Sequence, residues 1–157
     1  MAEDRQIVLG GEIVRYIQSI IDMKKRVLVI DDNPYNSTLY LEAVKSRFTV
    51  SVAYKIVTAL RLIRERYYDY IVIDVMMPTQ GMTSKYELTY ELTTGFEFYR
   101  DYIMPLNLDS KVIFWSRLDK AVFTSFWEYP PKNVSYLQKN VSPLHLLDYL
   151  LELEKQK

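Results

Sequence analysis

The fold is decided by VLVIDDNP, residues 27–34, in which four consecutive apolar residues run directly into two aspartates. An apolar run without polar alternation is typical of a strand that helices cover on both faces in a parallel sheet. Asp31 and Asp32 end this run, and Asn33 or a nearby polar residue can cap a following helix. The stretch therefore predicts a buried parallel strand that leads straight into a helix.

The alternation of short apolar runs and amphipathic segments continues on the C-terminal side of this stretch. Further strands are predicted at 48–54, 70–73, 111–115 and 134–137. Apolar residues at helical spacing predict helices that end near Arg47, cover 56–66, and start at Ser142-Pro143 with the serine as cap. A short aromatic helix is predicted within 118–133. This order of elements predicts an α/β doubly wound domain.

Two segments lie outside this alternation. Residues 79–94 are longer than the usual connection of 2 to 6 residues, so we treat them as an insertion after the third strand. Before the first strand, apolar residues within 11–23 recur at helical spacing and predict an extra amphipathic helix. We therefore divide the chain into an N-terminal extension, 1–23, and a domain, 24–157. The apolar face of the extension is expected either to pack on the flank of the sheet or to pair two protomers.

Composition excludes several classes of function. The 157 residues suit one domain, and the absence of cysteine together with a single histidine, His145, excludes thiolate and multi-histidine metal sites. Twenty basic residues balance twenty acidic ones, so no positive field favours nucleic acid as a partner. Residues 1–10 do not resemble a signal peptide, and no apolar run is long enough to span a membrane. We expect a cytoplasmic protein.

Polar side chains follow four of the predicted strands. Asp31 and Asp32 come after the first strand, Asp74 after the third, Ser116 after the fourth and Lys139 after the fifth. In open parallel sheets, ligands bind beyond the carboxyl ends of the strands, so we expect these side chains to meet. Clustered carboxylates repel one another unless a cation offsets them, and Mg²⁺ prefers oxygen ligands. The pattern therefore predicts a magnesium site.

In their order and spacing, these motifs resemble the CheY-like receiver domain of two-component response regulators, over about residues 25–154. The resemblance rests on VLVIDDNP (27–34), IVIDVMMP (71–78), Ser116 after an apolar strand, and YLQK (136–139). It implies a flavodoxin-like, doubly wound sheet of five parallel strands in the order 2-1-3-4-5. GFEFYR, residues 95–100, resembles the usual opening of the third helix in this family.

The resemblance also implies a phosphorylatable switch. Asp74 would accept a phosphoryl group from a histidine kinase or phosphotransfer protein, and any catalysis would be limited to this transfer and to autodephosphorylation. The implied roles are magnesium ligands at Asp31, Asp32, Asp74 and Met76, catalytic groups at Asp74, Ser116 and Lys139, and switch residues at Ser116 and Tyr136. Because few residues follow the last predicted helix, we expect a stand-alone receiver whose output is contact with a downstream protein, with a homodimer as one arrangement.

Departures from the family pattern leave other functions open. Arg117 stands where receivers have a small residue, and Asn140 where they usually have a cis proline; both favour a pseudo-receiver scaffold that binds partners without phosphorylation. A hydrolase that uses Asp74 as nucleophile ranks lower, because Met76 cannot serve as the second acid. A Rossmann nucleotide-binding module ranks lowest, because no glycine-rich loop follows the first strand.

Taken singly, the candidate site residues also have structural interpretations. Asp31 and Asp32 suit the N-terminus of a helix, where carboxylates are stabilising. Lys139 in isolation suits a solvated surface position, and Tyr136 suits ordinary packing against the sheet. Only the combination of these residues favours a phosphoryl site.

Overall fold

Five parallel strands form a single sheet in the order β2-β1-β3-β4-β5. The computed structural model describes residues 2–78 and 93–156. The strands span Arg26–Ile30 (β1), Thr49–Ala53 (β2), Tyr70–Ile73 (β3), Lys111–Ser116 (β4) and Val134–Gln138 (β5). The flavodoxin-like class and the strand order predicted from the sequence are confirmed.

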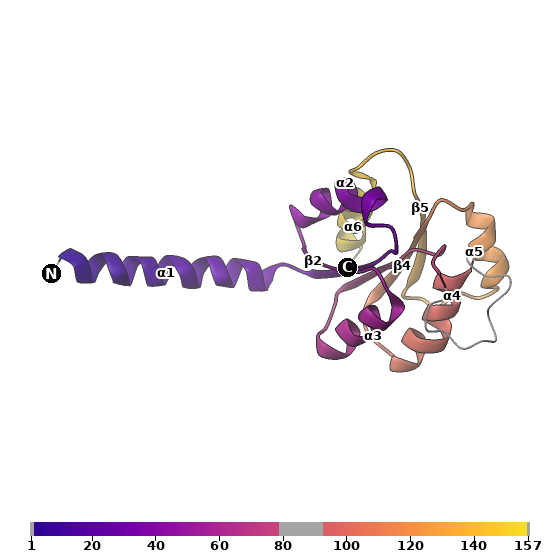
Figure 1. The fold of residues 1–157 in the computed structure, drawn as a ribbon, viewed down its shortest axis with the longest axis horizontal. Helices are drawn as coiled ribbons and strands as arrows, with labels where there is room; N and C mark the ends of the chain where they lie inside the picture. Colours follow the sequence, from indigo (N-terminus) through magenta and orange to yellow (C-terminus); the bar gives the residue numbers. More distant parts are fainter. Residues whose placement is uncertain (1, 79–92, 157) are drawn as a thin grey trace.

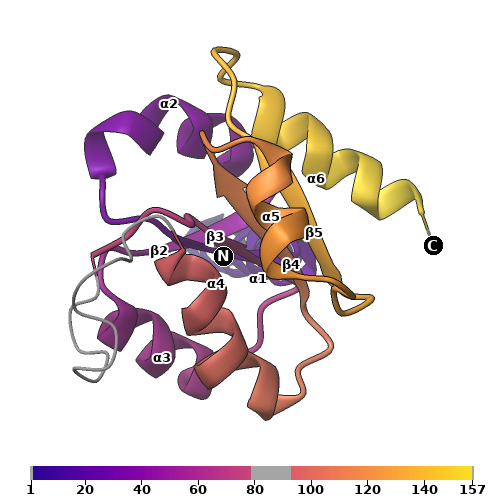
Figure 2. The same ribbon diagram turned by 90° about the vertical axis from the view of Figure 1, so that its right-hand side faces the viewer.

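Helices cover both faces of this sheet (Figure 2). The α-helices of the described residues span Ala2–Met23 (α1), which does not cover the sheet, and Pro34–Lys45 (α2), Ile56–Glu65 (α3), Thr94–Phe98 (α4), Lys120–Phe126 (α5) and His145–Lys155 (α6), which do. A π-helical turn and a 3₁₀ turn extend α4 as far as Leu106. Helices α2 and α6 pack on one face, whereas α3, α4 and α5 pack on the other. The uninterrupted apolar runs of β1 and β3 are explained by this double coverage.

The register of the central strands brings their carboxyl ends to one level. Ile30 of β1 pairs with Ile73 of β3, and Ile73 in turn pairs with Phe114 of β4. Ile30 and Ile73 are completely buried, so neither strand can slip by one residue without moving polar side chains into the core. The residues that follow these strands, Asp31 and Asp74, are therefore neighbours.

Helix α6 begins later than the sequence predicts. Ser142 lies in a turn, where its Oγ accepts a hydrogen bond from the Leu144 amide at 3.3 Å. The helix then begins at His145, whose amide donates to the carbonyl oxygen of Ser142. Ser142 therefore caps a turn and not the helix itself, and Pro143 lies before the helix, so this part of the prediction is wrong.

The predicted insertion, 79–94, falls almost entirely on residues 79–92, which lie outside the described residues. Thr93 and Thr94 are described, and Thr94 is the first residue of α4. Its side chain is completely buried. Thr94 therefore belongs to the packed helix and not to an exposed connection.

Helix α1 projects away from the sheet (Figure 1). Every residue from 10 to 20 is exposed, including Ile13 at 57% and Ile17 at 50%. The expectation that this helix packs on the flank of the sheet is therefore wrong. Within the described residues, no helix has both the length and the apolar character that crossing a membrane requires.

Candidate functional site

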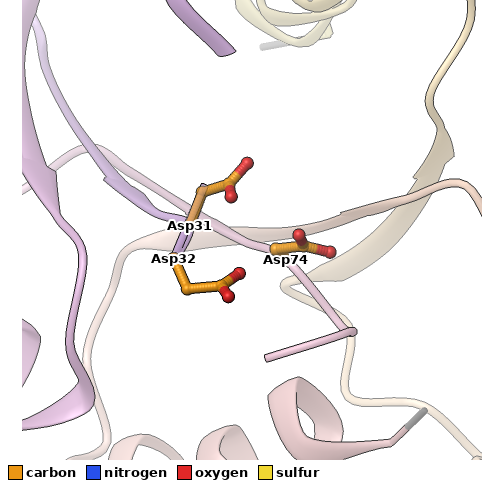
Figure 3. Close-up of side chains that lie close together, drawn as sticks. All are labelled: Asp31, Asp32 and Asp74. Carbon is orange, nitrogen blue, oxygen red and sulfur yellow. The ribbon is translucent and has the colours of Figure 1, made fainter. Parts of the chain in front are cut away.

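Three carboxylates meet beyond the carboxyl ends of β1 and β3 (Figure 3). Asp31, Asp32 and Asp74 each offer an oxygen that lies within 4.8 Å of the others. Asp31 and Asp74 are buried, whereas Asp32 is exposed. Backbone pairing continues one residue beyond the strands, because the Asp31 amide donates to Ala53 and the Asp74 amide donates to Ile30. This pairing fixes the two buried carboxylates side by side.

Lys139 places one ammonium group between the two buried carboxylates. Its Nζ lies 3.1 Å from Oδ2 of Asp31 and 3.2 Å from Oδ2 of Asp74. The lysine follows β5, and its amide donates to the Ser116 carbonyl oxygen at 2.7 Å, so the pairing of β4 with β5 also continues to this position. Residues that are 108 positions apart in the sequence thus share one buried charge cluster.

The ring of Trp115 lies against the ammonium group of Lys139. The Nζ of Lys139 lies 4.4 Å from the centroid of the Trp115 ring, within the range of a cation–π interaction. Trp115 is 1% exposed and meets the Tyr40 ring edge to face at 5.0 Å. Tyr40 in turn donates its hydroxyl to the carbonyl oxygen of Asn140. Sequence reasoning missed both aromatic residues. The only signal for Trp115 is its place beside Ser116, and nothing in the sequence singles out Tyr40.

The acidic cluster borders a cavity of about 220 Å³. Its walls are formed by the four charged residues already described together with three others: Asn33, Met76 and Arg117. The Met76 amide donates to Oδ1 of Asp74 at 3.2 Å. Arg117 thus brings a second cation to the cavity, at the position where the sequence departs from the receiver pattern.

Asn140, the second departure from that pattern, stabilises the turn after β5. Its Oδ1 accepts a hydrogen bond from the Ser142 amide at 2.8 Å. Its carbonyl oxygen accepts the Tyr40 hydroxyl. The chain after Lys139 is therefore held by a side-chain turn and by a contact with α2.

Ser116 and Tyr136 lie together behind the cavity wall. Ser116 is completely buried, and its Oγ accepts a hydrogen bond from the Leu118 amide at 3.3 Å. The Tyr136 hydroxyl donates to the Leu118 carbonyl oxygen, and its ring stacks on Phe123 at 5.5 Å. Burial raises the pKa of Tyr136, while a hydrogen bond with Ser116 lowers it. Ser116 is not among the described residues that line the cavity.

The charges of the cluster are unbalanced. Burial is the largest cause that raises the pKa of Asp74, and Asp31 adds to it; Lys139 and the Met76 amide lower the pKa, and the net value is about 6. Three carboxylates face the single Lys139 ammonium and the more exposed Arg117. A divalent cation would offset the remaining negative charge, and a set of carboxylate oxygens suits a hard ion. The acidic cluster therefore fits Mg²⁺.

Comparisons with known proteins find similarity among solved structures. No protein-family model matches the sequence, and no curated protein matches it. Among solved structures, the receiver domain of Francisella response regulator 1452 is 27% identical, with a TM-score of 0.62; the match covers 84% of this chain and 98% of that one.

Two further structures show the same similarity. A CheY-like receiver domain protein from Methanospirillum hungatei is 18% identical with a TM-score of 0.64, over 85% of this chain and 99% of that one. The response regulator TrrA from Thermotoga maritima, in complex with Mg²⁺ and BeF, is 22% identical with a TM-score of 0.60, over 82% and 98%. The resemblance predicted from the sequence is confirmed: the chain has the fold of CheY-like response regulator receiver domains.

Proposed function

We propose that this chain is a response regulator receiver that a histidine kinase or phosphotransfer protein phosphorylates on Asp74 in the cytoplasm. In this proposal, residues 24–157 form the receiver and residues 1–23 an extension. The observation that carries it is the Lys139 ammonium, bonded to both Asp31 and Asp74 at the wall of the acidic cavity. Holding a half-buried lysine between two buried carboxylates costs desolvation free energy, and clusters of this kind are typical of functional sites. Phosphoryl transfer is a reaction that such a cluster can serve.

Asp74 is the nucleophile in this reaction. An oxygen of its carboxylate forms a bond to the phosphorus, and the phosphorus–nitrogen bond to the donor histidine breaks. The departing imidazole nitrogen keeps the electron pair of that bond, and Asp74 becomes an acyl phosphate. The Lys139 ammonium is placed to neutralise charge on the phosphoryl oxygens, because it already lies 3.2 Å from this carboxylate.

The residues that would hold Mg²⁺ are the three carboxylates and Met76. The Met76 contribution would be its backbone carbonyl oxygen, because a thioether sulfur is a soft ligand that does not suit a hard ion. When bound, Mg²⁺ would supply positive charge to the phosphoryl group and to the carboxylates around it. Asp32 is the exposed carboxylate, so it is open to a hydrated ion that arrives from solvent.

The switch in this proposal consists of Ser116 and Tyr136. Phosphorylation adds oxygens that accept hydrogen bonds, and the Ser116 hydroxyl would turn toward them. Its present bonds to the Leu118 amide and to Tyr136 would then be lost. Because Tyr136 stacks on Phe123 of α5, this change would reach the surface formed by α5 and β5, where a downstream protein would bind.

A pseudo-receiver scaffold is the second candidate function. The observation that favours it is Arg117, whose side chain occupies the cavity wall at a position where receivers have a small residue. A bulky cation there would compete with an incoming phosphodonor for space near Asp74. In this case the chain would bind its partners without phosphorylation.

Mass spectrometry separates the two functions. The full chain is incubated with Mg²⁺ and acetyl phosphate, and the intact mass is measured for the wild type, Asp74→Asn and the control Asp109→Asn, which alters an exposed aspartate. The proposal expects one added phosphoryl group on the wild type and the control, none on Asp74→Asn, and none when EDTA replaces Mg²⁺. An unmodified but folded wild type would support the scaffold function instead.

A further inference from the structure

Helix α1 carries an apolar stripe that its own domain leaves exposed. Gly10, Ile13, Ile17 and Ile20 follow one another at intervals of three, four and three residues, which places them on one face of a helix. Val14 flanks this face. The large side chains of the stripe and its flank are exposed by 43 to 66%. Such a face is the kind that helices bury against a neighbour.

Gly10 lies within this stripe, and no contact with the described residues requires a glycine at this position. A Cβ added at Gly10 would meet no atom within 4 Å, and the same holds for Gly11. Glycine inside a helix lowers its stability relative to alanine, so an unneeded glycine is a disadvantage. The close approach of a second helix backbone would explain a glycine at this place.

The helix also lacks the packing that normally stabilises one. Isolated helices are marginal in water because nucleation is unfavourable, and most helices in proteins depend on burial of an apolar face. None of the residues from 10 to 20 is buried against the sheet. A 22-residue helix with two glycines in its middle therefore needs a partner along its stripe.

We infer that the stripe of α1 binds the same stripe of a second copy of this chain. The exposed apolar side chains of residues 13 to 20, including Tyr16 at the margin, present on the order of 500 Å² per helix, so pairing would bury about 1,000 Å² in total, the lower limit for a specific interface. A two-fold dimer needs only one self-complementary surface, and the stripe is uniformly apolar over its described length. The inference does not depend on phosphorylation.

The opposite face of α1 argues against a membrane surface as the occupant. Glu12, Arg15, Gln18 and Ser19 form that face, and it carries one acid and one base among its described residues. Helices that lie on anionic membranes have a polar face rich in lysine and arginine. The mixed charge of this face suits water on the outer side of a helix pair.

Sedimentation equilibrium of the full chain tests the inference. The wild type is expected to have twice the chain mass of 18.7 kDa at micromolar concentration. Ile17→Asp places a charge in the centre of the stripe and is expected to raise the dissociation constant at least about 100-fold, because a buried unpaired charge is costly. Gln18→Asp places the same charge outside the stripe and is expected to keep the dimer.

Circular dichroism and vesicle binding complete the test. The Ile17→Asp chain is expected to keep the spectrum of its sheet domain while losing helical signal, which shows that the variant folds. A monomeric wild type, a dimer that survives Ile17→Asp, or equal loss of dimer in both variants would each overturn the inference. Co-sedimentation of a monomeric wild type with phosphatidylserine vesicles would overturn it in favour of a membrane surface.

Discussion

Replacement of Asp74 by asparagine is expected to stabilise the protein at neutral pH. The side chain of Asp74 is 11% exposed, and its burial and the nearby Asp31 raise its pKa to about 6. The folded chain therefore holds a proton on this group more tightly than the unfolded chain, where the ordinary value is 3.8. Stability from this group is greatest at low pH and is lost as the pH rises from about 4 through 6.

The magnitude follows from the two pKa values. The difference between 3.8 and about 6 corresponds to about 3 kcal/mol of unfolding free energy, all of it lost above pH 7. Asparagine has nearly the same shape and does not ionise. Asp74→Asn is therefore expected to unfold with a free energy about 3 kcal/mol higher than the wild type at pH 7.5, or a midpoint temperature about 6 to 12 °C higher.

Urea denaturation at pH 7.5 and pH 4.5 measures this effect. EDTA is present throughout, because a bound divalent cation would stabilise the wild type selectively. The difference between the two proteins is expected to shrink at pH 4.5, where Asp74 is largely protonated in the folded chain. Equal stability of the two proteins at pH 7.5, or the same difference at both pH values, would refute the reasoning.

Three further variants test the support of the site. Gly95→Ala places a Cβ 2.3 Å from the Asp74 carbonyl oxygen and is expected to lower the free energy of unfolding in urea by about 3 kcal/mol. The control Gly11→Ala, with nothing near its Cβ, is expected to change that free energy by less than about 0.5 kcal/mol, and equal effects of the two variants would contradict the steric explanation. Lys139→Met leaves two buried carboxylates without their shared ammonium and is expected to lower the free energy of unfolding by about 3 to 5 kcal/mol at pH 7.5, and by less at pH 4.5. A decrease that is the same at both pH values would refute the charge-pairing argument. Trp115→Leu removes the ring beside the Lys139 ammonium and is expected to slow phosphorylation by acetyl phosphate about tenfold, whereas Trp115→Phe is expected to restore part of the rate. Identical rates for the two variants would exclude a cation–π role.

The sheet was predictable because its strands are short, apolar and covered on both sides. In β3 the predicted and observed bounds coincide at residues 70–73. The predicted end of β4 differs from the observed end by one residue, because Ser116 still pairs with Gln138 although it is polar. A pattern of apolar residues indicates which residues are buried, whereas the residue at which a strand ends depends on backbone hydrogen bonds to its neighbour.

The support beneath Lys139 was not predictable from the sequence. Trp115 has the pattern of a core residue, and the sequence does not distinguish a ring that fills space from one that faces an ammonium. Tyr40 lies 75 positions before Trp115, and their rings meet because α2 packs on the face of the sheet into which Trp115 points. Such contacts depend on how a helix packs across the sheet, which periodicity does not specify.

The surroundings of α1 were also not predictable from the sequence. Helical spacing of Ile13, Ile17 and Ile20 correctly indicates a helix with an apolar face. The same spacing occurs in a helix that packs on its own sheet and in one that packs on a partner. The exposure of this face in the structure excludes the first arrangement for residues 10–20.

A crystal structure of the chain with Mg²⁺ and beryllofluoride tests the central claim most directly. We expect one metal ion held by the carboxylates of Asp31, Asp32 and Asp74, and one beryllofluoride on Asp74 in contact with the Lys139 ammonium. A cavity that contains neither group, with the carboxylates still arranged as in Figure 3 and Lys139 still within 3.2 Å of Asp31 and Asp74, would contradict this prediction.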